Sequence, residues 1–164
     1  MSTASLSLQT SLLFIFSTLM IGCGNEAIIF VDPTVSSPQV NVISGILGST
    51  VTGSFQLQLV LGPRASGPST VNFGAVNITD AGGKTALVSS LSMMPSEPFP
   101  INVAPDSEIM VNVPFDLGNK TIPMATMQAL CSAGQVTISG TITDSLVDTA
   151  TPFVSEAVKP MGCP

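Results

Sequence analysis

Residues 54–62 read Ser-Phe-Gln-Leu-Gln-Leu-Val-Leu-Gly, and this stretch decides the fold. Every second side chain from Phe55 to Leu61 is apolar, whereas most of the residues between them are polar. Because successive side chains of an extended chain point to opposite faces, this alternation places the apolar set on one face. Gly62 and Pro63 then interrupt the pattern. The stretch predicts a half-buried β-strand that ends at a turn.

The same alternation recurs along the chain between turns rich in Gly and Pro. The apolar side chains of 71–73 and 76–78 have opposite parity, so we predict a β-bulge at Gly74-Ala75 that restores a common face. Asp80-Ala81-Gly82-Gly83 has the composition of a hairpin turn. Further strand candidates are residues 27–31, 40–43, 85–91, 99–103, 109–115 and 136–143.

One stretch has helical character. Residues 123–131 contain good helix formers after a Pro that suits a first helical turn, and Met124, Met127 and either Leu130 or Cys131 share one face. We expect this helix to pack on the sheets, with its Met side chains filling the core. Seven to nine short strands and one short helix predict an all-β, immunoglobulin-like antiparallel β-sandwich over residues 38–164.

The first 22 residues carry no charged side chain and contain an apolar core at 12–21, which is too short for an ordinary membrane-spanning helix. Met20-Ile21-Gly22-Cys23 follows, and it resembles the bacterial lipobox. The resemblance implies a signal helix over 1–22, cleavage after Gly22, a lipid on Cys23 and a tether over 23–37. In lipoproteins of this class, Asp directly after the lipidated Cys is the usual signal for retention in the inner membrane. Gly24 stands at this position, which favours the outer membrane. The alternative is an ordinary Cys23 behind a conventional signal peptide or an N-terminal anchor helix.

The chain contains three cysteines, which is an awkward number for an exported protein. A lipid on Cys23 would leave Cys131 and Cys163 to form a disulfide. In the chain-entropy model, closing a loop of about 33 residues stabilises a fold by roughly 3–4 kcal/mol. The alternative is two free buried thiols. Two thiolates in a chain without His do not make a structural zinc site.

Composition excludes several functions. The chain has 10 acidic and 4 basic side chains and no His, Trp or Tyr. Unclustered cations argue against nucleic-acid binding, and the missing His removes the usual base of Ser and Cys enzymes. Without Trp or Tyr, there is no stacking platform for sugars. We therefore expect neither an enzyme nor a cofactor.

Two pairs of carboxylates are the candidates for a cation site. Asp106 with Glu108, and Asp144 with Asp148, could offer oxygen ligands to Ca²⁺. Neither pair has the regular spacing of a calcium loop, so turn caps and solubilising charges are the simpler interpretation. We assign no metal site.

A second resemblance concerns the body of the chain. Residues 40–61, the segment 98–105 leading into 109–115, the short helix, and 134–143 with Gly140 look like the water-stress and hypersensitive-response domain of the group 2 late-embryogenesis-abundant proteins. The resemblance implies a small β-sandwich with a helix at one end and without catalytic residues. We expect a lipid-anchored, non-enzymatic envelope protein with an unknown protein partner. The alternative is a conventionally secreted, adhesin-like or ligand-binding module.

Overall fold

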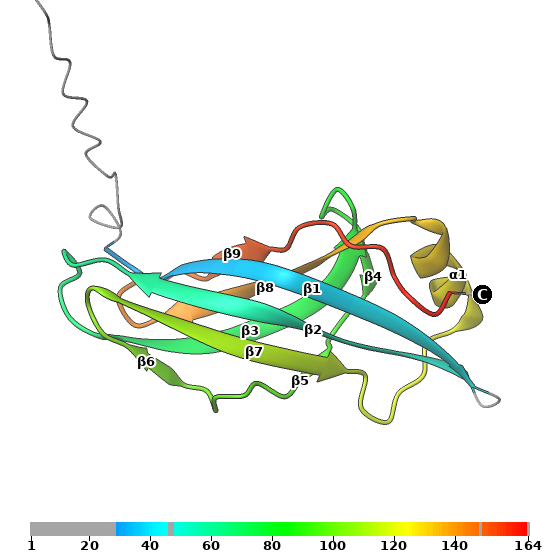
Figure 1. Ribbon diagram of the computed structural model, residues 1–164, viewed down its shortest axis with the longest axis horizontal. Helices are drawn as coiled ribbons and strands as arrows, with labels where there is room; N and C mark the ends of the chain where they lie inside the picture. Colours follow the sequence, from blue (N-terminus) through cyan, green and yellow to red (C-terminus); the bar gives the residue numbers. More distant parts are fainter. Residues whose placement is uncertain (1–28, 46–47, 148, 164) are drawn as a thin grey trace, which may run out of the picture.

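Two antiparallel sheets pack face to face in the computed structural model, which describes residues 29–45, 48–147 and 149–163 (Figure 1). One sheet has the strand order β1-β2-β7-β5, and the other has the order β4-β3-β8-β9, with β6 also paired to β3. The elements are β1 (Asp32–Gly45), β2 (Gly48–Leu61), β3 (Ser69–Asp80), β4 (Ala86–Val88), β5 (Ser92–Met93), β6 (Ile101–Val103), β7 (Ser107–Asp116), α1 (Met124–Ser132), β8 (Val136–Asp144) and β9 (Thr151–Val154).

The order of the strands is that of an immunoglobulin-like sandwich. β1-β2-β7-β5 corresponds to strands A-B-E-D of that architecture, and β3-β8-β9 corresponds to C-F-G. The predicted all-β sandwich with one short helix is therefore confirmed. The disulfide differs from that of antibody domains, because it does not join the two sheets through strands B and F.

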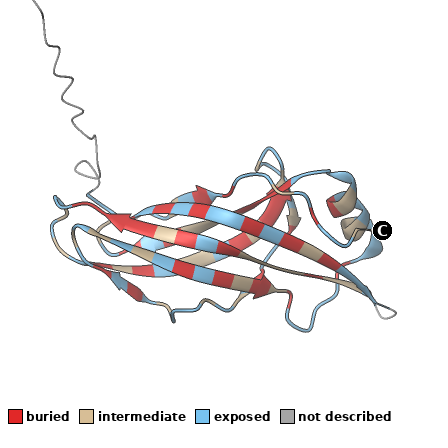
Figure 2. Ribbon diagram, viewed as in Figure 1, coloured by how far each residue is buried: buried red, intermediate tan, exposed pale blue. Residues whose placement is uncertain are grey.

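The core lies between the sheets and is built from the predicted alternation. Leu57, Leu59 and Leu61 of β2 are completely buried, and Phe55 is nearly so (Figure 2). Phe55 contacts the ring of Phe153 from the opposite sheet at a centroid distance of 6.1 Å. Aromatic and aliphatic side chains from both sheets thus fill the interior without a Trp.

The predicted bulge in β3 is also confirmed. The pairing of β3 with β8 shifts register between Phe73 and Val76, which brings the apolar residues on both sides to the core. The residue at position 74 lies against the neighbouring strand: an added Cβ at Gly74 would come within 2.2 Å of Thr141 Oγ1. A glycine is therefore required where the bulge approaches β8.

The boundary between tether and sandwich differs from the prediction. β1 begins at Asp32, within the range 23–37 that the sequence assigns to a tether. Pro33 and Val35 are buried, so this Pro- and Ser-rich segment presents an inward face despite its composition. A second bulge, between Ser36 and Gln39, keeps the two halves of β1 in phase with β2.

The helix forms where it is predicted, but one of its side chains points elsewhere. Leu130 is completely buried, and Met127 and Cys131 pack partly against the core. Met124 is 70% exposed, so the expectation that it fills the core is wrong. It occupies the first position of α1.

Candidate functional site

The two ends of the elongated sandwich carry different structures. The described chain begins just before β1 at one end, whereas α1 and the C-terminal segment lie at the other (Figure 1). β1 runs from the first end to the second. At about 3.3 Å per residue, a 14-residue strand spans roughly 45 Å. The entry of the chain and α1 are therefore separated by most of the length of the domain.

A buried carboxylate fixes the point of entry. Asp144, the last residue of β8, is only 4% exposed. Its Oδ2 accepts a hydrogen bond from Val31 N–H at 2.7 Å. Its Oδ1 accepts from Ser69 Oγ–H at 2.9 Å and from Leu146 N–H at 2.6 Å. We call these four residues the Asp144 clamp, which joins the incoming chain to one end of the β3–β8 pair, where β3 begins and β8 ends.

Sequence reasoning considered Asp144 only as a turn cap or a calcium ligand. The position of Asp144 in the strand pattern would have predicted that its side chain points inward, because Ile138, Ile142 and Asp144 fall on the same face of β8. An inward carboxylate needs buried donors, and the clamp supplies them. Asp148, its proposed partner, lies outside the described residues.

The other candidate carboxylates do not assemble into a site. Asp106 lies in the turn before β7 with a φ of 57°, and both Asp106 and Glu108 are exposed. Within residues 29–45, 48–147 and 149–163, no group of three or more Cys, Asp or Glu side chains is placed to hold a metal ion.

The half-buried Asp80 stabilises a hairpin turn instead. Its Oδ1 accepts hydrogen bonds from the N–H groups of Lys84 at 2.9 Å and Thr85 at 3.3 Å. These two backbone donors lower the pKa of Asp80 below its ordinary value, because they favour the charged form. The predicted turn at Asp80–Gly83 is confirmed by the antiparallel pairing of β3 with β4.

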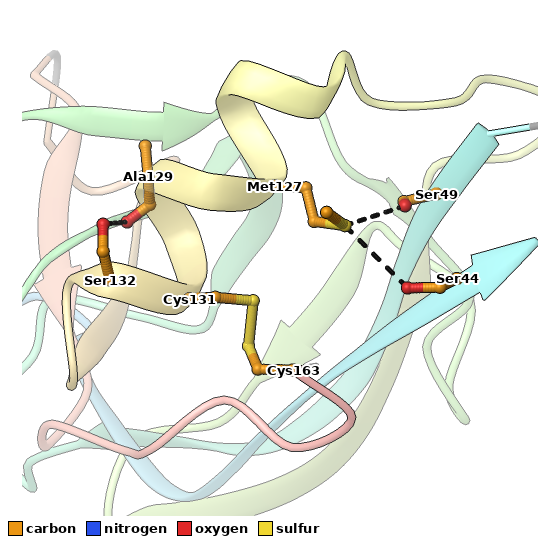
Figure 3. The surroundings of a disulfide bond; sticks show 7 residues. All are labelled: Ser44, Ser49, Met127, Ala129, Cys131, Ser132 and Cys163. Carbon is orange, nitrogen blue, oxygen red and sulfur yellow. Dashed lines mark hydrogen bonds between the residues drawn. A yellow bond between two sulfur atoms is a disulfide. The ribbon is translucent and has the colours of Figure 1, made fainter.

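The second candidate site surrounds the predicted disulfide, which is confirmed. Cys131 of α1 is bonded to Cys163 with a Cα–Cα distance of 5.6 Å (Figure 3). Met127, one helical turn earlier, points toward the hairpin of β1 and β2. There its sulfur accepts hydrogen bonds from Ser49 Oγ–H at 3.0 Å and Ser44 Oγ–H at 3.8 Å. The helix is thus attached to the C-terminal segment on one side and to the hairpin on the other.

The segment 155–163, which we call the strap, crosses from one sheet to the other. Val158 exchanges two backbone hydrogen bonds, of 2.8 and 2.9 Å, with the first residue of β8. Three residues later, Met161 N–H donates to Val40 O at 2.9 Å, and Met161 O accepts from Val42 N–H at 2.8 Å. Met161 therefore pairs with β1, in parallel, and the strap closes one side of the sandwich.

A shallow depression of about 590 Å³ lies beside the disulfide. Its lining residues are Cys131 and the end of the strap from Lys159 to Cys163. Lys159 is the single charged side chain among the residues that line it. The depression gives solvent a route to the two half-buried sulfur-bearing residues.

The predicted cleavage and lipidation residues, Gly22 and Cys23, lie outside the described residues. In the part of the chain that the structure describes, no helix combines the length and apolarity needed to cross a membrane. No protein-family model matches the chain, and neither a curated protein nor a solved structure is significantly similar to it.

Proposed function

We propose that this protein is a lipoprotein of the bacterial cell envelope, anchored through Cys23 in the outer membrane. Its β-sandwich serves as a non-enzymatic module that binds or supports another envelope protein. The lipobox-like Met20-Ile21-Gly22-Cys23 and the preceding uncharged apolar stretch are the basis of the anchor. The pairing of Cys131 with Cys163 supports it, because the remaining cysteine is then the one in the lipobox.

The Asp144 clamp is the observation that carries the proposal furthest. It holds Val31 at one end of the domain, and Val31 is eight Cα–Cα steps along the chain from Cys23. At no more than about 3.6 Å per residue, the link spans at most roughly 29 Å. An anchored domain would therefore hold its clamp end near the bilayer and extend the α1 end, roughly 45 Å farther, away from it.

We place the contact with the partner at the α1 end, because this end lies farther from the proposed anchor. Ile43, Met124 and Met161, on the hairpin, the helix and the strap, are 50%, 70% and 54% exposed. Exposed apolar side chains on neighbouring elements are common where proteins meet. The absence of His from the whole chain and the oxidised state of Cys131 and Cys163 support a role without catalysis.

The anchor is tested by expressing the full chain in a bacterium with an outer membrane. Wild type should sediment with membranes, and its intact mass should show cleavage after Gly22 and a diacylglycerol on Cys23. Cys23→Ser should lose the lipid and the cleavage. Cys163→Ser, a matched control, removes a different thiol and should remain anchored. A soluble wild-type product with a free Cys23 thiol would overturn the proposal in favour of a conventionally secreted module.

A further inference from the structure

The edge of β1 is protected in two different ways. β1 is the outer strand of its sheet, and such a strand offers unpaired backbone groups to other chains. Pro33, Pro38 and the bulge between Ser36 and Gln39 interrupt its first half. Its second half has no such interruption and is covered by the strap at Met161. This half is therefore a strand-pairing edge that is already in use.

The end of the strap is shaped for this edge. Gly162 has a φ of +74°, and a Cβ added to it would lie 2.2 Å from Val42 O. Only glycine permits this approach, because any other side chain would collide with the backbone of β1. Met161 supplies the hydrogen bonds, Gly162 the close contact and Cys163 the covalent bond to Cys131.

The strap crosses between the sheets with almost no slack. The β8 contact of Val158 and the β1 contact of Met161 are three Cα–Cα steps apart along the chain. These steps span at most about 10–11 Å, and packed sheets lie about 10 Å apart. Short connecting segments favour exchange of a terminal segment between copies. The disulfide is the covalent bond that retains this segment.

We propose that Val40–Val42 and Cys131 form a docking site for the Met-Gly-Cys segment at the end of the strap, bent at Gly162, and that the strap of a second copy can fill this site once the disulfide opens. The site and the strap belong to one chain, so exchange is reciprocal and closes as a two-fold dimer. The proposal is independent of the lipid on Cys23.

The chemistry of exchange is thiol–disulfide interchange. A dithiol reductant gives two electrons and two protons to the Cys131–Cys163 bond, yielding two thiols and the oxidised reductant. On reoxidation, the Cys131 thiolate attacks glutathione disulfide and releases one glutathione. The Cys163 thiolate of the second copy then attacks the mixed disulfide and releases the other. The depression beside the disulfide admits the reagent, and Lys159 attracts its thiolate.

The test uses two mixtures of full-length variants with glutathione disulfide. In the first mixture, the strap of the variant Gly162→Ala/Cys163→Ser cannot approach β1, so the docking site of this variant is empty. The variant Cys131→Ser offers an intact strap with a free Cys163 thiol. We expect a dimer linked by Cys131 and Cys163, identified by non-reducing peptide mapping. In the second mixture, Cys163→Ser supplies the docking site and Cys131→Ser/Gly162→Ala offers the strap. The same three substitutions are present, but Gly162→Ala now prevents the offered strap from docking.

The second mixture should yield at least tenfold less of the linked dimer. Equal yields would overturn the proposal, because the thiols would then meet by collision without docking. No Cys131–Cys163 link in either mixture would also overturn it.

A measurement on the wild type avoids any folding defect of the variants. After reduction with dithiothreitol, hydrogen exchange at the Val42 amide should accelerate at least tenfold, while the Leu57 amide between β2 and β7 remains protected. If alkylation showed that both Cys131 and Cys163 were reduced and the protection of Val42 were unchanged, the release of the strap would be refuted.

Discussion

Replacing Asp144 with Ala should destabilise the domain more than any other single removal of a carboxylate from the described residues. The substitution leaves three donors without their acceptor. Two of them, Val31 N–H and Ser69 Oγ–H, belong to residues with 0% exposure, so water cannot replace the carboxylate without a rearrangement. Each unsatisfied buried donor costs about 1–3 kcal/mol, which gives about 2–6 kcal/mol in total. Leu146 N–H is only half-buried and can bind water instead.

Asp144→Asn should have a smaller effect. It keeps one acceptor oxygen, but its amide group then faces one of the donors, so we expect a loss of about 1–3 kcal/mol. Asp116→Ala is the matched control. Asp116 also ends a strand and accepts a backbone hydrogen bond, from Gly118 N–H at 2.7 Å, but it is only half-buried. Its removal should cost no more than about 1.5 kcal/mol.

The assay is equilibrium unfolding in urea, followed by circular dichroism because the chain contains neither Trp nor Tyr. The reasoning is refuted if Asp144→Ala loses less than about 1 kcal/mol, or no more than Asp116→Ala loses. A double-mutant cycle with Ser69→Ala should show a coupling of about 0.5–3 kcal/mol, because both partners belong to one hydrogen-bond network.

Three further predictions concern the disulfide, a glycine contact and pH. Cys163→Ser should lower the free energy of unfolding by about 3–4 kcal/mol, as measured in urea, because it frees the loop in the unfolded chain. If the fully reduced wild type were as stable as the oxidised wild type, this prediction would be contradicted. Gly53→Ala should cost about 1–3 kcal/mol, since its Cβ would lie 2.4 Å from Cζ of the Phe115 ring, whereas the open Gly67 should tolerate Ala. The lowered pKa of Asp80 means that its contribution to stability is present above the unfolded pKa and is lost as pH falls through the folded one. The stability difference between wild type and Asp80→Asn should therefore shrink below about pH 4, and an NMR titration of Asp80 at or above the ordinary aspartate midpoint would disprove it.

The parts of the fold that could be predicted are those with a local cause. The alternation in Phe55–Leu61 has the period of a strand whatever its partners are, and the change of parity around Gly74 identifies a bulge without any coordinates. The disulfide followed from a count, because assigning Cys23 to a lipid leaves one pair. Short strands escaped this reasoning: β9, Thr151–Val154, is too brief to display a period, and its pairing with β8 is what makes it a strand.

The sequence by itself determined the class of fold and the positions of most strands, since periodicity and composition are properties of short segments. The count of cysteines favoured the pairing of Cys131 with Cys163. Only the tertiary structure decided what those segments do together. Asp144 receives two of its three hydrogen bonds from residues 113 and 75 positions away in the chain, and no local pattern indicates such partners. The strap likewise reaches β1 only because folding brings the second half of β1 and the C-terminal segment to one edge of the sandwich. Contacts between distant segments depend on the whole fold, so the clamp and the docking edge were visible only once the sheets were assembled.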